Sequence, residues 1–370
     1  MDRPVLIVAA SGRALAASAR RGGFVPLVAD YFGDQDMLAS AHAHRCLPDG
    51  LNIGMQSDTV LTALAELAQG LEPEGVVCGT GFEDRPDVLA AIGKRFKLIG
   101  NSPEVVRQVK HPTQWAALCR TCGIPHPEIA LEQPADPGDW LVKRHGGAGG
   151  GHIKDDLPRE RRAGTYYQRR VAGTPVSALF LAEGRRATRV GFSTQWSAAA
   201  PHQPFRYGGA VTPAAVSPHV AAALDDVIRR ITRVVPLMGI NSADFLVDGD
   251  QFWLLEINPR PGATFDVFES EGGSLFALHV DACGGKLPAR IPDPVGARAS
   301  AIVYAAQDIP TMPAVEWPDW TADRPRADTS IRSGDPLCTV TAAAATADEA
   351  RAIVAQRSEA VLSLVSARAA

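Results

Sequence analysis

The stretch LLEINPRPGA at residues 254–263 runs from an apolar segment straight into three polar side chains, Glu256, Asn258 and Arg260. Glu256 and Asn258 are two residues apart, so on a β-strand their side chains point to the same face. One interpretation is a strand that simply reaches the surface, with Glu256 paired to Arg260, because surface ion pairs are common. In the other interpretation, the side chains on that face bind a cation, and Arg260 at the end of the strand binds a negative charge that develops beyond the cation.

An Asp-Gly pair at 248–249, just upstream, is a strong hairpin signal. A three-residue turn at 249–251 would place Asp244 directly opposite Glu256, whereas a two-residue turn would place it on the other face. In the first register, two carboxylates and the amide oxygen of Asn258 converge, and the carboxylates repel each other unless a hard cation lies between them. Such oxygen ligands suit Mg²⁺, which keeps its remaining positions for water and nucleotide phosphates.

A second chemical feature is the glycine-rich segment WLVKRHGGAGGGHIK at 140–154. Five glycines in six positions, 146–151, cannot form the interior of a helix or strand, so they predict a flexible hairpin loop. Their bare amides can approach a phosphate closely, and Lys143 supplies a compact positive charge beside them. The pattern GxxxxGK[ST] is missing from this segment, so it is not a P-loop.

Alternating apolar strands and helices at the start of the chain predict an α/β domain over residues 1–105. Continuous apolar strands separated by helices are typical of a parallel sheet covered on both faces. The expected strands are 4–10, 24–30, 75–79 and 97–100, and the expected helices include 57–69 and 85–95.

Asp30 invites a dinucleotide-binding interpretation, because it follows Gly12 by about the distance at which an acid binds a ribose. The glycine fingerprint GxGxxG is missing from the preceding turn, so a structural role for Asp30 is favoured.

The rest of the chain mixes helices with antiparallel strands. A helix carrying Lys110 precedes the glycine-rich segment, and 165–186 reads as two antiparallel strands joined at a Gly-Thr-Pro turn. Residues 193–213 look like a loop. A helix is expected at about 217–236, and residues 286–370 predict a small α+β unit with strands near 300–307 and 337–344 and a closing helix at about 346–368.

Composition narrows the function classes. The 370 residues carry a formal net charge of −4 without a long run of one sign, which gives no footprint for nucleic acid or for a membrane surface. The first apolar run is too short to span a membrane and its flanks do not match a signal peptide, so a cytoplasmic protein is expected. The six cysteines are too sparse for a disulfide scaffold, and the CxxC at Cys119 and Cys122 has no second pair to complete a zinc site.

The order of these features resembles the ATP-grasp superfamily, which includes biotin carboxylase, D-alanine-D-alanine ligase and many carboxylate-amine ligases. The resemblance covers about 1–280, and the EINPRPG motif with its upstream aspartate is its most specific part. It implies a Rossmann-like pre-ATP-grasp α/β domain at 1–105, an ATP-grasp domain at 106–285 and a small C-terminal α+β domain at 286–370. The ATP-grasp domain would divide into a lid subdomain near 106–165 and a larger subdomain near 166–285.

The resemblance also assigns roles to single residues. Asp244, Glu256 and Asn258 match the magnesium ligands, with Mn²⁺ as a substitute metal, and Arg260 matches the arginine that steadies an acyl phosphate. Lys110 and Lys143 would contact the ATP phosphates. Residues 193–213 lie where relatives bring substrate-facing residues near the triphosphate, so Arg206 is either a ligand for an anionic group or a solvated loop arginine. The loop glycines that would close over the nucleotide are Gly147, Gly149 and Gly150, and the hinge that would meet adenine, residues 168–171, includes Gln168 and Val171.

The implied activity is a ligase that activates a small-molecule carboxylate as an acyl phosphate and joins it to an amine, with release of ADP and phosphate. A cofactor-building role in one-carbon metabolism is one expectation, and a homodimer is another, since relatives are often dimers. Three alternatives stay open: a carboxylase that activates bicarbonate, a nucleotide-binding regulator without turnover, and a nicotinamide dehydrogenase built on the N-terminal domain.

Overall fold

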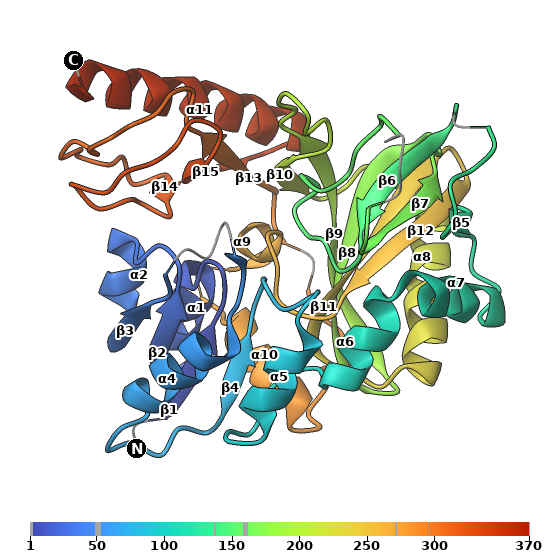
Figure 1. The fold of residues 1–370 in the computed structure, drawn as a ribbon, viewed down its shortest axis with the longest axis horizontal. Coiled ribbons are helices and arrows are strands. Elements are labelled where there is room, and N and C mark those ends of the chain that lie inside the picture. Colours follow the sequence, from blue (N-terminus) through green and yellow to red (C-terminus); the bar gives the residue numbers. More distant parts are fainter. Residues whose placement is uncertain are drawn as a thin grey trace.

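A computed structural model describes residues 3–48, 53–136, 138–157, 162–270, 272–292 and 294–369. These described residues form three sheets, of four, three and eight strands, with helices packed against them (Figure 1). Within the described ranges, no helix is both long enough and apolar enough to cross a membrane.

The four-stranded sheet at the N-terminus is parallel, as predicted. Its order is β3-β2-β1-β4, and the strands are β1 (Pro4–Val8), β2 (Val25–Asp30), β3 (Ala43–Cys46) and β4 (Val76–Cys78). Side chains alternate between two cores, because Val5 and Ile7 pack on one face while Leu6 and Val8 pack on the other. The helices of this part are α1 (Arg13–Arg21), α2 (Gln35–Ser40), α4 (Ser57–Leu67) and α5 (Pro86–Gly93).

The strand expected at 97–100 does not form, so that prediction is wrong. Only an isolated bridge forms, between Val76 and Leu98, with hydrogen bonds from Val76 N to Lys97 O and from Ile99 N to Val76 O. Gly100 then adopts φ +150°, which is open to glycine and turns the chain away from the sheet.

The three-stranded sheet carries the glycine-rich segment at one end. Its order is β5-β7-β6, with β5 (Ile129–Ala130), β6 (Trp140–Arg144) and β7 (Thr165–Arg169), and the helices α6 (Pro103–Lys110) and α7 (Pro112–Thr121) precede it. β7 was expected to pair with the next strand, β8 (Thr174–Gly184), and this is wrong. β8 is instead hydrogen-bonded on both sides within the eight-stranded sheet, so the short segment 170–173 crosses from one sheet to the other.

The eight-stranded sheet has the order β12-β11-β8-β9-β10-β13-β15-β14. Its other strands are β9 (Ala187–Ser197), β10 (Tyr207–Thr212), β11 (Leu237–Asp248), β12 (Gln251–Asn258), β13 (Ala297–Tyr304), β14 (Thr321–Ala322) and β15 (Pro336–Ala344). The helices α8 (Pro218–Val234), α9 (Phe265–Phe268), α10 (Leu275–Cys283) and α11 (Ala347–Ala369) complete the fold. Because β13 pairs with β10, the C-terminal strands continue the same sheet.

The expectation of a loop at 193–213 is also wrong, since β9 and β10 occupy both ends of it. The glycines that suggested a loop serve packing instead. An ideal Cβ at Gly209 would lie 2.4 Å from Cζ2 of Trp196, so glycine lets the Trp196 ring lie against β10.

Candidate functional site

The β11–β12 hairpin brings Asp244 opposite Glu256 and Ser242 opposite Asn258. The turn itself differs from the one expected, because Asp248 pairs with Gln251 and leaves only two residues between the strands. A bulge restores the register: the pairing shifts between Asp244 and the next residue, and the extra residue lies on β12. The two carboxylates therefore share one face despite the shorter turn.

Short polar contacts join the predicted metal ligands to one another and to Lys110. Asp244 accepts hydrogen bonds from Ser177 Oγ at 2.6 Å and from Asn258 Nδ2 at 2.8 Å. Lys110 Nζ donates to Glu256 Oε2 and to Asn258 Oδ1, both at 2.7 Å. The lysine ammonium thus lies between two oxygen atoms that were predicted to bind a cation.

The two carboxylates differ in their affinity for a proton. Burial and then the charge of Glu256 raise the pKa of Asp244 to about 6. Burial pushes the pKa of Glu256 up as well, but Lys110 and Lys143 outweigh it and lower that pKa to about 2. Asp244 is therefore the carboxylate whose charged form is disfavoured, and a cation bound beside it would stabilise that charged form.

The donor set fits a hard divalent cation. Among the residues that the structure describes, no group of three or more His, Cys, Asp and Glu side chains could hold a metal ion. The oxygen atoms available here belong to Asp244, Glu256 and the amide of Asn258, and all three are oxygen ligands of the kind that Mg²⁺ prefers.

Lys143 and Gln168 lie on neighbouring strands of the three-stranded sheet and face the carboxylates. Lys143 Nζ donates to Gln168 Oε1 at 3.3 Å, and both side chains are buried. Burial lowers the pKa of Lys143, but Tyr166 and Glu256 outweigh it, so the net direction is upward and the charge is kept. Val171 lies in the segment that crosses between the sheets and is half-buried.

The glycine-rich loop packs against two other segments. Tyr207 N donates to Gly149 O at 2.9 Å, and an ideal Cβ at Gly150 would lie 1.9 Å from the carbonyl oxygen of Phe205. At Gly147 a Cβ would lie 2.4 Å from the ring of His152. Close approach therefore requires glycine at Gly147 and Gly150, and the positive φ of Gly149 and Gly150, +70° and +72°, favours glycine there as well.

Arg260 pairs with Glu83, a residue that the sequence did not single out. Arg260 Nε donates to Glu83 Oε1 at 2.7 Å, and Nη2 lies 3.4 Å from Asn258 Oδ1. The surface pair between Glu256 and Arg260 is therefore not the one that forms, because Glu256 is bound by Lys110. The position of Glu83 after β4 was the only available signal, since side chains after parallel strands gather at one edge of the sheet.

Arg206 points to the C-terminal strands. Its Nε donates to Ala198 O and its Nη1 to Gly334 O, both at 3.0 Å, and its guanidinium lies 3.6 Å from the centre of the Tyr304 ring. These contacts connect the turn before β10 to the C-terminal segment. The Arg206 guanidinium is thus already bound by two backbone carbonyls and one aromatic ring of the protein itself.

Asp30 and the CxxC pair lie apart from this site. Asp30 is buried and accepts from Gly12 N at 2.9 Å and Gly33 N at 3.0 Å, so it holds the turns that follow β1 and β2. Cys119 and Cys122 are free thiols on and just after α7.

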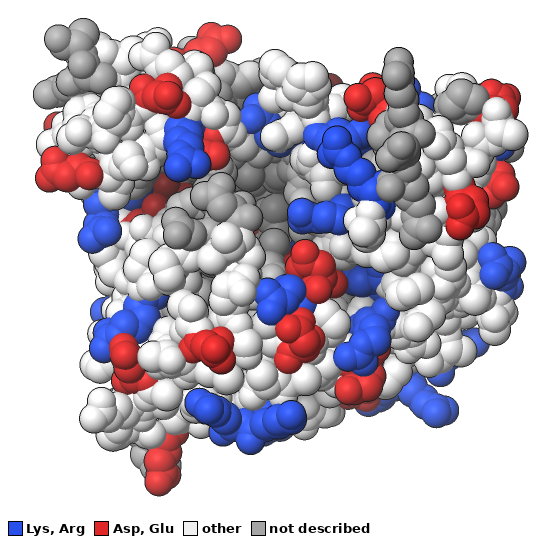
Figure 2. All heavy atoms as spheres, viewed as in Figure 1, with Lys and Arg blue, Asp and Glu red and all other residues white. Residues whose placement is uncertain are grey.

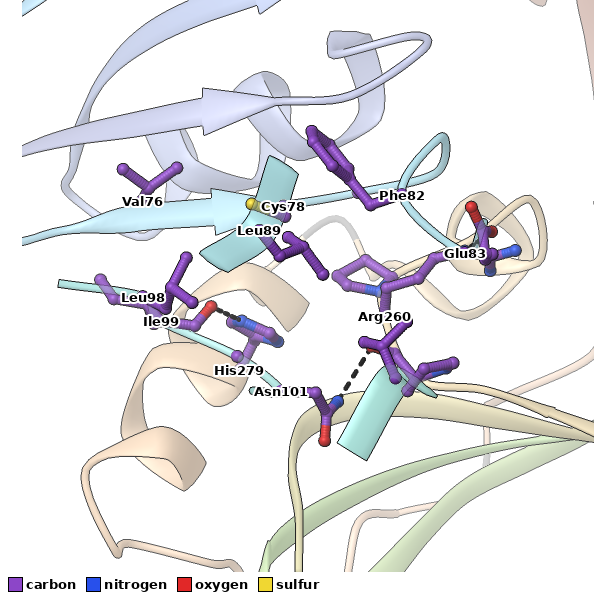
Figure 3. A pocket seen from close by; sticks show the side chains of 15 residues that line it. Val76, Cys78, Phe82, Glu83, Leu89, Leu98, Ile99, Asn101, Arg260 and His279 are labelled. Atoms are coloured by element: carbon purple, nitrogen blue, oxygen red, sulfur yellow. Dashed lines mark hydrogen bonds and ion pairs between the residues drawn. The ribbon is translucent and has the colours of Figure 1, made fainter. Parts of the chain in front are cut away.

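Two hollows lie near the residues of the candidate site. Figure 2 shows one face hollowed between the C-terminal strands and the three-stranded sheet, with Lys and Arg side chains gathered on the side of the latter. The second is a cavity of about 20 Å³ behind Arg260, lined by side chains that include Glu83, Asn101 and His279 (Figure 3). A cavity of this size holds about one water molecule, so the second hollow is too small for a nucleotide.

Comparisons with known proteins agree on one fold. Residues 115–264 match the ATP-grasp domain family. By sequence, the chain is 36% identical over 92 residues to the formate-dependent phosphoribosylglycinamide formyltransferase of Pseudomonas savastanoi pv. phaseolicola. That match covers 25% of this chain and only 23% of the relative.

Solved structures are similar over almost the whole chain. Biotin carboxylase from Campylobacter jejuni has a TM-score of 0.71 at 16% identity, covering 94% of this chain and 89% of that one. The L-amino acid ligase from Bacillus licheniformis has a TM-score of 0.70 at 13% identity, covering 96% and 97%. N5-carboxyaminoimidazole ribonucleotide synthetase from Thermotoga maritima has a TM-score of 0.68 at 13% identity, covering 96% and 98%. At these identities the likeness shows the fold alone.

Proposed function

Because residues 115–264 match the ATP-grasp domain family that the motifs predicted, we propose that the protein is an ATP- and Mg²⁺-dependent ligase that joins a small-molecule carboxylate to an amine. The observation that carries the proposal is the pairing of Asp244 with Glu256 beside Asn258, opposite Lys143 and the glycine-rich loop. An exposed surface ion pair would not explain this half-buried carboxylate pair, which is bordered by Lys110, whose side chain is 6% exposed, and by the buried Lys143.

In the proposed reaction, a carboxylate oxygen of the substrate attacks the γ-phosphorus of ATP, and the bond to the β–γ bridging oxygen breaks so that ADP leaves with the electron pair. The amine then attacks the acyl carbon, phosphate leaves and the amine loses a proton. Catalysis of this kind rests mainly on positioning and on charge stabilisation.

The residues of this chain divide that work. Lys110 and Lys143 bind the phosphates, and Arg260 binds the transferred phosphoryl group. Asp244, Glu256 and Asn258 would hold Mg²⁺, which neutralises phosphate charge when bound. Closure of the glycine-rich loop excludes water, which would otherwise hydrolyse the acyl phosphate.

The backbone at 168–171 would meet the adenine, as the resemblance implies. Gln168 is buried against Lys143, so its side chain is held close to the phosphate-binding lysine. Val171 follows at the crossing between the two sheets, where a backbone amide and carbonyl could face a purine edge.

The test is ADP release from ATP and Mg²⁺ against a panel of carboxylates, each with and without amines or bicarbonate. Release that needs both a carboxylate and an amine would support the ligase, while dependence on bicarbonate would point to the carboxylase. Glu256→Gln should keep the fold and abolish Mg²⁺-dependent release, with Glu74→Gln, a remote surface partner of Arg3, as the matched control. Tight Mg-ATP binding with no turnover across the panel would contradict the proposal and favour a regulator.

A further inference from the structure

Arg260 is not held in place by packing on every side. It lines the cavity behind the site together with its neighbours Pro259 and Pro261 (Figure 3). On the other side an ideal Cβ at Gly262 would lie 2.0 Å from Arg260 Nη1, so the guanidinium occupies space that only glycine leaves free. With a cavity on one side and a glycine on the other, polar contacts must fix the direction of the guanidinium.

Glu83 makes the stronger of those contacts. The side chains of Glu83 and Arg260 are 3% and 13% exposed, and Nε of the arginine lies 2.7 Å from Glu83 Oε1, compared with 3.4 Å from Nη2 to Asn258 Oδ1. The second carboxylate oxygen of Glu83 accepts from Gly81 N at 2.8 Å, so the carboxylate is itself held by the backbone after β4. Buried charge-assisted hydrogen bonds of this kind fix geometry well.

The glycine-rich loop touches the same segment. Gly146 has φ +61°, and an ideal Cβ there would lie 2.6 Å from the Glu83 carbonyl oxygen and 2.6 Å from Asp84 Cα. The loop backbone therefore lies directly on the backbone that carries Glu83. A shift of the loop at Gly146 would remove the backbone that packs against Glu83 and Asp84.

We infer that Glu83 is a positioning residue that orients Arg260 towards the transferred phosphoryl group, and that the docked glycine-rich loop holds Glu83 in place through Gly146. The inference rests on the proposed role of Arg260 in the ligase reaction. The inferred contact links loop closure to the orientation of Arg260. When the glycine-rich loop closes over ATP, it also completes the arrangement that binds the phosphoryl group.

A double-mutant cycle on turnover tests the first half. Glu83→Gln and Arg260→Ala are measured singly and together by ADP release. Because Glu83 acts through Arg260, the double variant should turn over as slowly as Arg260→Ala alone, while Glu83→Gln alone lowers kcat by roughly tenfold or more and changes KM for ATP by less than about twofold. Independent effects that multiply, or a rise confined to the KM of the amine, would show that Glu83 acts on something other than Arg260.

Phosphate binding tests the same idea without the unidentified substrates. Binding of inorganic phosphate to the enzyme with MgADP, measured by calorimetry, should weaken roughly tenfold in Glu83→Gln while MgADP affinity stays the same. Unchanged phosphate binding would overturn the inference even if the ligase activity is established. Failure of the parent protein to bind MgADP would instead contradict the proposed function.

Gly146→Ala tests the part played by the loop, with Gly164→Ala as its matched control. Both glycines have positive φ, +61° and +74°, but a Cβ at Gly164 meets nothing within 4 Å. Only Gly146→Ala should weaken phosphate binding to the MgADP complex, and it should add little in a Glu83→Gln background. Equal effects of the two substitutions would show that backbone strain, and not the contact of the loop with the Glu83 backbone, causes the weaker phosphate binding.

Discussion

Asp244→Asn should stabilise the metal-free protein while it abolishes activity. Burial, followed by the charge of Glu256, raises the pKa of Asp244 from 3.8 to about 6, so at neutral pH the folded protein carries a charge that its surroundings disfavour. The amide has nearly the same shape. It can accept from Asn258 Nδ2 with its oxygen and donate to the hydroxyl of Ser177 with its nitrogen, so both hydrogen bonds of the carboxylate are replaced.

The magnitude follows from the shift. Two pKa units correspond to about 3 kcal/mol, and imperfect replacement of the two hydrogen bonds reduces this, so the expected gain at pH 7 is about 1 to 3 kcal/mol. The folded pKa of Asp244 is raised, so its favourable contribution is complete below pH 3.8 and is lost as the pH rises through 6. The gain from Asp244→Asn should therefore be largest above pH 6 and disappear near pH 4.

The assay is urea or thermal unfolding without metal between pH 4 and 8, with ADP release measured in parallel. Glu256→Gln is the matched comparison with the opposite sign, because it leaves Lys110, whose side chain is 6% exposed, without its carboxylate. Both variants should lose Mg²⁺-dependent turnover. A loss of stability in Asp244→Asn at pH 7, or a gain that does not change with pH, would refute the assigned electrostatics.

Three further outcomes are expected. Arg260→Lys keeps the charge but loses the planar fork, so kcat should fall more than ATP affinity; the reverse pattern in steady-state kinetics and calorimetry would move Arg260 to nucleotide binding. Gly150→Ala places a Cβ against Phe205 O, so the loop cannot dock, and proteolysis near the loop should speed up; unchanged cleavage would mean that the neighbour yields. Burial lowers the pKa of His279 to about 4, and its Nδ1 accepts from Ile240 N. The neutral ring therefore contributes stability above pH 6.5 that is lost as the pH falls towards 4, and the parent's unfolding free energy should fall more steeply over that range than that of His279→Gln.

Local patterns predicted β1, β2 and β4 of the N-terminal sheet, because these strands are continuous apolar runs separated by helices, but they did not predict β3, whose sequence includes His44 and Arg45. The Asp-Gly signal likewise located the β11–β12 hairpin. The pairing of Asp244 with Glu256 was predicted from a three-residue turn, whereas the structure reaches it with a two-residue turn and a bulge. A bulge depends on how β12 twists against its neighbours, and the alternation of side chains carries no sign of it.

Contacts between distant segments were the part that the sequence could not predict. β7 and β8 are separated by four residues yet lie in different sheets, since each finds better partners elsewhere in the chain. Glu83 and Arg260 are 177 positions apart, and an isolated acid after a short strand has no feature that distinguishes it from a surface residue. Its significance depends on the arginine that the fold brings to it.

The continuity of the eight-stranded sheet also limits how the chain can be shortened. β13 pairs with β10 from Gly209–Ala301 to Thr212–Arg298. A chain ending near residue 285 would leave β10 as an open edge, whose unpaired amides and carbonyls invite association with other chains. Such a fragment should aggregate even though every predicted ATP-binding residue is present. The C-terminal segment thus covers the β10 edge of the same sheet that carries the predicted metal ligands.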